Sequence, residues 1–142
     1  MTKINNLLVF ALLLSVFSVA TANTESRQLI KLPEKMKNHM MSNMRDHLAA
    51  INKILINMAA EEYDKAAEIA ENRLGMSSLD SHGAMHMAQF MPENMQAIGT
   101  RMHRAASRFA LRAEEGEVLA AYAALSAITT ECVACHASYR LN

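Results

Sequence analysis

Net charge, long apolar runs and strand patterns are all missing from this chain of 142 residues. Lys and Arg number 14 and Asp and Glu also number 14, so the net charge gives no support for binding to nucleic acid or to an anionic membrane. After the N-terminal segment, no stretch approaches the ~20 uninterrupted apolar residues that span a bilayer. The absence of strand patterns excludes folds built on a βαβ unit, and the two cysteines leave few choices for a thiol site.

The N-terminus has the pattern of a secretory signal peptide. Lys3 precedes an apolar stretch over residues 7–19, and Ala20-Thr21-Ala22 is a small-x-small cleavage signal. The apolar stretch is short for a membrane span, although a retained N-terminal anchor is the alternative. We therefore predict a signal peptide over residues 1–22 and one small domain over residues 23–142.

Near the C-terminus the chain reads Cys132-Val133-Ala134-Cys135-His136, a Cys-x-x-Cys-His string that is typical of covalent haem attachment. On a helix, Cys132 and Cys135 lie at positions i and i+3, so both thiols can meet the two vinyl groups along one haem edge. His136 follows directly and can turn an imidazole nitrogen toward the iron. The string predicts one covalently attached haem c, which would use both cysteines of the chain.

Two other readings of the same string fit less well. A thioredoxin-like redox pair needs a βαβ setting and a Cys near a helix N-terminus, whereas this pair lies at the end of a predicted helix. A zinc site needs four ligands, and none of the other five histidines forms a recognisable second half of such a site. Haem attachment is the interpretation that we favour.

Hydrophobic periodicity predicts four helices and no strand over the mature chain. The helices run from about Pro33 to Met58, from Glu62 to Leu74, from Pro92 to about Gly116, and from Glu117 to about Tyr139. The expected inward stripes of the first and last helices are Met41, Met44, Leu48, Ile51, Leu55 and Met58, and Val118, Tyr122, Leu125, Thr129, Cys132, His136 and Tyr139. Those of the second and third helices are Tyr63, Ala66, Ala67, Ala70 and Leu74, and Met95, Ile98, Met102, Ala105, Phe109 and Ala113. Near-heptad spacing predicts an all-α, antiparallel four-helix bundle.

The haem-binding residues fall on the inward stripe of the last helix, so we expect the haem to lie among the helices. The chain also contains 12 Met, and flexible thioether side chains suit a core that must fit around a large flat ligand. A haem supplies apolar area that so small a domain lacks. We expect the haem-free protein to be less ordered than the haem form.

The motif and its surroundings resemble one family. A Cys-x-x-Cys-His string close to the C-terminus of an all-helical chain, followed by Tyr139-Arg140, is similar to cytochrome c′ and its low-spin relatives, the class II c-type cytochromes. Met44 followed by His47 resembles the first-helix pattern of that family. The segments Leu74-Gly75-Met76, His82-Gly83 and Phe90-Met91-Pro92 resemble a subgroup of periplasmic cytochromes from Gram-negative bacteria.

The resemblance implies roles for individual residues. Cys132 and Cys135 correspond to the thioether positions, His136 to the proximal iron ligand, and Arg140 to the basic residue beside the proximal imidazole. Three residues before Met44, low-spin members carry a ligating Met, whereas cytochrome c′ carries an apolar side chain over an open sixth site. That position is Met41 here.

Met40 is the alternative ligand, since a small rotation of the helix exchanges the two side chains. The third reading is that Met41 only packs against the haem and leaves the iron five-coordinate.

A Met and His pair on the iron favours a periplasmic electron carrier that exchanges electrons with partner proteins, because this pair raises the reduction potential. An open sixth site instead favours binding of a diatomic gas such as nitric oxide or carbon monoxide. We expect no enzymatic activity, since no acid and base pair falls where the distal face should be. Homodimers are common in the resembling family, so a homodimer is a further expectation.

Three smaller patterns have less specific readings. His82 and His86 lie four residues apart in a Met-rich segment and could hold copper, although a loop that packs its methionines under the bundle is the plainer reading. Arg101, Arg104, Arg108 and Arg112 could neutralise haem propionates or form a docking patch for an acidic redox partner, although a solvated face is the plainer reading. His47 is interpreted as a surface or boundary residue.

Overall fold

The computed structural model describes residues 25–142, so the predicted signal peptide over residues 1–22 lies outside the described residues. Four long helices dominate this part of the chain, as the sequence predicts. They are α2 (Glu34–Ala59), α3 (Tyr63–Arg73), α5 (Glu93–Glu114) and α6 (Val118–Ser138). The segment between α3 and α5 contains two short helices, η1 (Met76–Ser78) and α4 (Ala84–Ala88). The described chain is therefore mostly helical.

Proline and glycine mark several of the helix ends. Pro33 and Pro92 directly precede α2 and α5, where the fixed φ of proline suits the entry into a helix and the missing N–H loses no helical hydrogen bond. Glu34 and Glu93 follow in the first turns, where a carboxylate interacts favourably with the helix dipole. Gly116 connects α5 to α6 with a φ of 69°, a left-handed conformation that glycine adopts without strain.

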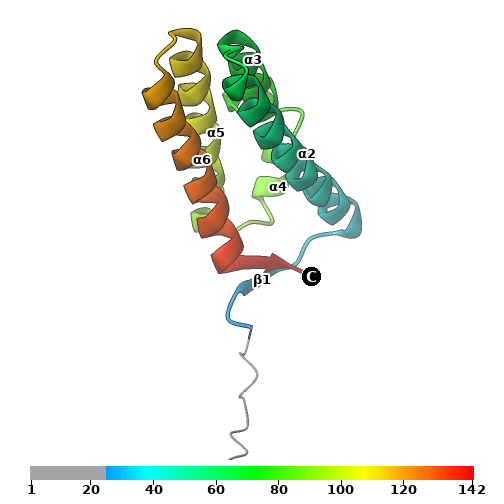
Figure 1. Ribbon diagram of the computed structural model, residues 1–142. Coiled ribbons are helices and arrows are strands. Elements are labelled where there is room, and N and C mark those ends of the chain that lie inside the picture. The colour runs from blue at the N-terminus through cyan, green and yellow to red at the C-terminus, as the bar shows by residue number, and fades with distance from the viewer. Residues whose placement is uncertain (1–24) are drawn as a thin grey trace, which may run out of the picture.

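The long helices pack in chain order, α2 against α3, α3 against α5 and α5 against α6. Figure 1 shows the α2–α3 pair beside the α5–α6 pair, with the two pairs diverging toward the end of the molecule that holds α4 and the C-terminus. Where the pairs are close, a main core forms around Ile54, Leu74, Phe109 and Ile128, each at most 1% exposed, together with small alanines. The small side chains of the core alanines let the helix backbones approach closely.

Two short strands were not predicted. β1 (Gln28–Ile30) and β2 (Tyr139–Leu141) pair in parallel, with Leu29 opposite Arg140. As a result α6 ends at Ser138, and Tyr139 belongs to β2 and not to the last helix. The pairing ties the start of the described chain to its end, and Asn142 extends it by donating its backbone N–H to the carbonyl of Ile30 (3.3 Å).

The predicted stripes of α3 and α5 are confirmed, and that of α2 is wrong except at Met58. Ala66, Ala67 and Ala70 on α3 and Leu74 directly after it are buried, and so are Met95, Met102, Ala105, Phe109 and Ala113 on α5. Tyr63 and Ile98 are partly buried. On α2 the buried residues are instead Met40, Asn43, His47, Ala50, Ile54 and Met58. Met41, Leu48 and Leu55 are exposed, because α2 is rotated from the predicted orientation. It buries Asn43, which donates to the carbonyl of His82, and His47, whose ring lies beside that of His82.

The stripe predicted for α6 is confirmed only in part. Leu125 is buried, whereas Tyr122, Thr129 and His136 are exposed. The helix is apolar on nearly every side, so hydrophobicity does not define its inward face. Among the described residues, α6 is also the one helix that is long and apolar enough to cross a membrane, by length and composition alone. We did not predict this from the sequence, because the apolar residues of α6 do not form one uninterrupted run. In the structure it packs along α5.

Candidate functional site

Cys132 and Cys135 lie on the last turns of α6, and both are partly buried free thiols. Their surroundings differ. Cys132 packs against the main core, and Cys135 packs against a second apolar cluster. The Cys-x-x-Cys pair is therefore placed at the junction of two cores, on the side of α6 that faces the protein.

The second cluster, which we call the methionine cluster, collects side chains from almost every element around the diverging end of the helix pairs. Met40, Met87 and Met95 are its buried methionines and come from α2, α4 and α5. Ile30 and Leu32 are also buried in it, and the partly buried residues packed against it are Met36, Phe90, Met91, Cys135, Tyr139 and Leu141. Because thioether side chains are flexible and polarisable, this cluster is the most adaptable apolar region beside the cysteines.

The electrostatics of the two thiols do not favour thiolate chemistry. Burial raises the pKa of both Cys132 and Cys135 above the usual value of a thiol, and the Glu131 carboxylate adds to the rise at Cys132. Catalytic and metal-binding cysteines need the opposite shift, toward the thiolate at neutral pH. The pair is thus poorly suited to act as a dithiol redox centre.

His136 does not lie where the sequence predicts. Its side chain is exposed and does not face the bundle interior. The main core covers α6 only as far as Cys132, and the last turn of α6 extends beyond that core toward the two strands. The imidazole is consequently exposed to solvent.

Arg140 lies four residues after His136, on β2. Its Nε atom is buried and has no hydrogen-bond partner among the described residues. An orphaned guanidinium nitrogen is costly, and a carboxylate is the partner that would satisfy it best. The pairing of β2 with β1 holds Arg140 in place, and Arg27 just before β1 donates from Nη1 to the carbonyl of His136 (3.5 Å).

Of the two candidate distal ligands, the structure buries Met40. Met40 is 7% exposed and belongs to the methionine cluster, which also contacts Cys135. Met41 is 41% exposed and belongs to neither core, so its predicted inward orientation is wrong. The rotation of α2 described above is the physical reason for the exchange.

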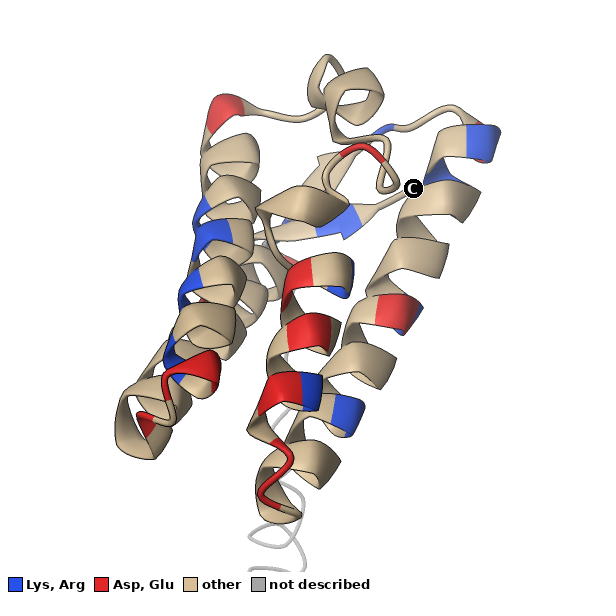
Figure 2. Cartoon of the chain, turned by 90° about the horizontal axis from the view of Figure 1, so that it is seen from above, with Lys and Arg blue, Asp and Glu red and all other residues tan. Residues whose placement is uncertain are grey.

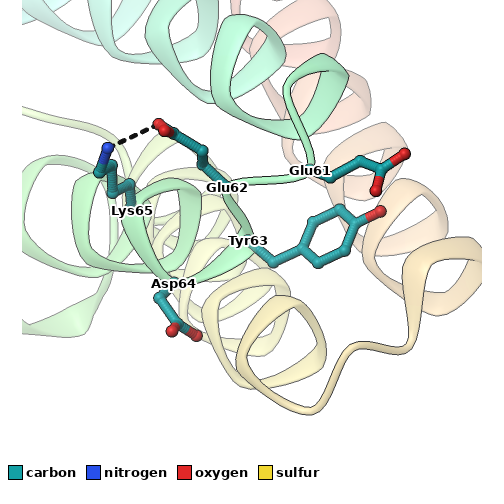
Figure 3. Close-up of a pocket in the computed structure, with 5 residues that line it drawn as sticks. All are labelled: Glu61, Glu62, Tyr63, Asp64 and Lys65. Atoms are coloured by element: carbon teal, nitrogen blue, oxygen red, sulfur yellow. Dashed lines mark ion pairs between the residues drawn. The ribbon is translucent and has the colours of Figure 1, made fainter.

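Two surface hollows lie away from the cysteines. One, of about 270 Å³, is at the turn between α2 and α3 and is lined by charged residues and Tyr63, with Lys65 and Glu62 directed toward each other at 2.8 Å (Figure 3). The other, of about 230 Å³, lies between α5 and α6 beside Arg101, Arg104 and Arg108. Beside Cys135 the space is filled by the methionine cluster.

The arginines of α5 form a basic row on the outside of the molecule. Figure 2 shows basic residues following one another along the α5–α6 side and acidic residues gathered along α3. Arg101 makes two hydrogen bonds to the Glu131 carboxylate (2.8 and 2.9 Å), and Arg112 pairs with Glu115 (2.7 Å) and Glu117 (3.1 Å). Two of the four arginines are thus neutralised within the chain, as on an ordinary solvated face.

The histidines of the Met-rich segment do not form a pair. His82 is buried and His86 is exposed, so the predicted copper alternative for these two residues has no geometry to support it. His47, expected at the surface, is 8% exposed and lies beside His82. The sequence carried no signal for this, because the two residues are far apart in the chain and meet only in the folded bundle.

No family model, no curated protein and no solved structure matches this chain.

Proposed function

We propose that the protein is a periplasmic c-type cytochrome that carries electrons through one covalently attached haem c. Cys132 and Cys135 would form the two thioether bonds and His136 would be the proximal iron ligand. The iron of such a group cycles between the ferric and ferrous states, and the protein adds no substrate chemistry of its own. The observation that carries the proposal is the placement of the Cys-x-x-Cys-His string at the end of α6, with Cys135 packed against the methionine cluster.

The residues around the string fit a haem. The two thiols are unpaired and lie on one helix at a spacing of three, and the side chain of His136 is exposed. The methionine cluster provides an apolar region between α2 and α6 whose long, flexible side chains can rearrange around a flat ligand. Arg140 offers a buried nitrogen that lacks a partner and that a haem propionate would satisfy.

The burial of Met40 favours an electron carrier over a gas binder. Met40 projects from α2 into the cluster that contacts Cys135, on the side of the site opposite α6. A thioether on the iron together with an imidazole stabilises the ferrous state and raises the reduction potential. We therefore assign the distal position to Met40 in place of Met41. The partners of such a carrier would be periplasmic redox proteins. If no methionine binds the iron, the alternative is a five-coordinate binder of a diatomic gas.

The attachment is tested by exporting the full chain in a bacterium that matures c-type cytochromes. On a denaturing gel, the parent should retain haem-dependent peroxidase staining, because thioether bonds survive denaturation. Cys132→Ala and Cys135→Ala should each weaken the stain, and the double variant should abolish it. Val133→Ala is the matched control, because Val133 lies between the two cysteines and is 68% exposed.

Mass spectrometry of the parent gives the second readout, a mass increase of one haem per chain. A parent that is exported and folded but carries neither the stain nor the added mass contradicts the proposal. Equal staining of the parent and the double cysteine variant would contradict it as well, since the haem would then be held without these thiols.

A further inference from the structure

Three histidines from three separate elements meet inside the bundle. His47 lies on α2, His82 in the turn between η1 and α4, and His103 on α5, and each is 8% exposed. The ring centroids are 4.8 Å apart for His47 and His82, 5.5 Å for His82 and His103, and 6.1 Å for His47 and His103. We call this group of His47, His82 and His103 the histidine triad. It does not include Cys132, Cys135 or His136.

The hydrogen bonds of His103 fix where its proton lies. Its Nδ1 atom is 2.7 Å from the backbone carbonyl oxygen of Leu74. A carbonyl oxygen only accepts, so Nδ1 must carry the proton and donate it. In the neutral ring the lone pair is then on Nε2.

The same reasoning applies to His82. The Ser78 hydroxyl donates its hydrogen to the carbonyl of Gly75 (2.7 Å) and lies 3.3 Å from Nδ1 of His82. Because that hydroxyl hydrogen is already used, the serine oxygen accepts from Nδ1, and the lone pair of His82 is also on Nε2. An imidazole whose Nδ1–H donates to a carbonyl or a hydroxyl is held in the way that protein metal ligands usually are.

His47 provides the third observation. Its Nε2 atom is buried and has no hydrogen-bond partner among the described residues. A buried polar nitrogen without a partner is costly and rare in folded proteins, and a bound ion or water is a common explanation. The triad thus combines two nitrogens with assigned lone pairs and one nitrogen that lacks any partner.

The spacing of the rings suits a shared ion. With a metal–nitrogen distance of about 2 Å and tetrahedral angles, two imidazoles bound through Nε2 have ring centroids about 5 Å apart. The three separations in the triad bracket this value. Within residues 25–142 no group of three His, Cys, Asp or Glu side chains is placed to hold a metal ion as it stands, so binding requires the rings to rotate.

We propose that His47, His82 and His103 bind one divalent transition-metal ion of the Zn²⁺ class through their Nε2 atoms, at a site separate from the haem. Three neutral imidazoles bind ions of this class in preference to Mg²⁺ or Ca²⁺, which prefer oxygen ligands. The ion would connect α2, the η1–α4 turn and α5, and it would give His47 Nε2 its missing partner.

The electrostatic surroundings agree with a set of neutral imidazoles. Burial lowers the pKa of His47 to about 4 and also lowers the pKa of His82 and His103, so all three rings are neutral and able to bind at physiological pH. Asp46 faces the triad and partly balances an added positive charge, although its carboxylate is shared with Arg73. His39, also on α2, donates from Nε2 to the backbone carbonyl oxygen of His82 (3.0 Å).

The test titrates the purified full chain, with its haem in place and freed of other metals by a chelator, with Zn²⁺ and with Co²⁺. We expect one equivalent of Zn²⁺ to bind in calorimetry and Co²⁺ to produce the strong visible bands of a tetrahedral site, recorded as a difference spectrum against the haem. His103→Asn should weaken Zn²⁺ binding at least tenfold. His86→Asn is the matched control, because His86 is an exposed histidine of the same Met-rich segment.

A readout on the parent protein keeps the test decisive if His103→Asn does not fold. Long-range ¹H–¹⁵N spectra of the imidazoles, recorded on the ferrous protein with and without Zn²⁺, should show shifted Nε2 resonances for three histidines and unchanged resonances for His39 and His86. Absence of stoichiometric binding overturns the proposal, and so does binding that shifts His86 or is lost in His86→Asn.

Discussion

Met40 and Met41 are neighbours in sequence, yet one is 7% exposed and the other is 41% exposed. This contrast gives a direct prediction for the proposed haem protein. Met40→Ala should remove the sixth ligand, produce a high-spin spectrum and allow ferrous iron to bind carbon monoxide. Met41→Ala should leave the low-spin spectrum unchanged, because its side chain does not reach the methionine cluster.

Optical spectra of the two purified variants, recorded with and without carbon monoxide, make the comparison. A high-spin spectrum from Met41→Ala alone would return the distal position to Met41. A parent protein that already binds carbon monoxide would favour the five-coordinate gas binder.

The two thiols give a second prediction at the scale of single residues. Burial raises the pKa of Cys132 and Cys135, and alkylation requires the thiolate, so a haem-free folded chain should react slowly with iodoacetamide at neutral pH. The rate should rise with pH through a midpoint above the ~8.5 of a free thiol, and urea should move that midpoint down toward the free value. Mass spectrometry of Cys132→Ala and Cys135→Ala reports each remaining thiol separately.

Haem-loaded protein is the control for the alkylation experiment, because thioether bonds would leave no thiol to react. Reaction of the folded, haem-free chain that is as fast at neutral pH as that of the unfolded chain would contradict the raised pKa values.

At the scale of elements, two glycines in the left-handed conformation allow the cost of backbone strain to be measured apart from the cost of a side-chain contact. Gly83 (φ 63°) and Gly116 (φ 69°) both adopt a conformation that costs an alanine roughly 1–2 kcal/mol. A Cβ at Gly116 would meet nothing within 4 Å, whereas at Gly83 it would lie 3.2 Å from Nε2 of His39. We expect Gly116→Ala to lower the free energy of unfolding by about 1 kcal/mol and Gly83→Ala to lower it further.

Urea unfolding of the parent and both variants measures the difference. Equal losses at the two positions would mean that His39 moves aside without cost. No loss at either position would show that these turns do not need a left-handed glycine.

How well the sequence predicted each element depended on how clearly its hydrophobic pattern defined one face. The stripes of α3 and α5 could be predicted because large or small apolar residues fall on one side and charged residues on the other. On α2, Met41, Leu48 and Leu55 form as regular a stripe as the buried one. Hydrophobicity favoured the stripe without Asn43 and His47, but both of these residues are buried against the η1–α4 turn.

Contacts between distant segments could not be read from local pattern. β1 and β2 are three residues each and form only because residues 28–30 and 139–141 meet in the folded chain. The same is true of the histidine triad, since His47, His82 and His103 come from three elements. The Cys-x-x-Cys-His string could be recognised because its chemistry is set by spacing within one helix. Which methionine of α2 lies on the far side of the site from α6, Met40 or Met41, depends instead on the rotation of α2.

At the scale of the whole molecule, α2 exposes three large apolar side chains at intervals of seven residues. Leu48 is 73% exposed, Leu55 is 44% exposed and Met41 is 41% exposed. Partly buried Met44 and Ile51 complete an alternation of three and four residues, although Ile51 also packs against the main core. This is the a and d spacing of a helix that packs lengthwise on another helix. The formal net charge of the chain is zero, so repulsion between two copies does not oppose their association.

We therefore expect the protein to form a homodimer through α2, and Leu48→Glu to convert it to a monomer, because the substitution places two like charges at the centre of an apolar contact. Sedimentation of the parent and the variant at micromolar concentration measures the change in mass. Leu119→Glu on α6 is the matched control, since Leu119 is 87% exposed but does not belong to the α2 stripe. A monomeric parent, or a dimer that Leu119→Glu dissociates and Leu48→Glu does not, would show that the α2 stripe is not the contact.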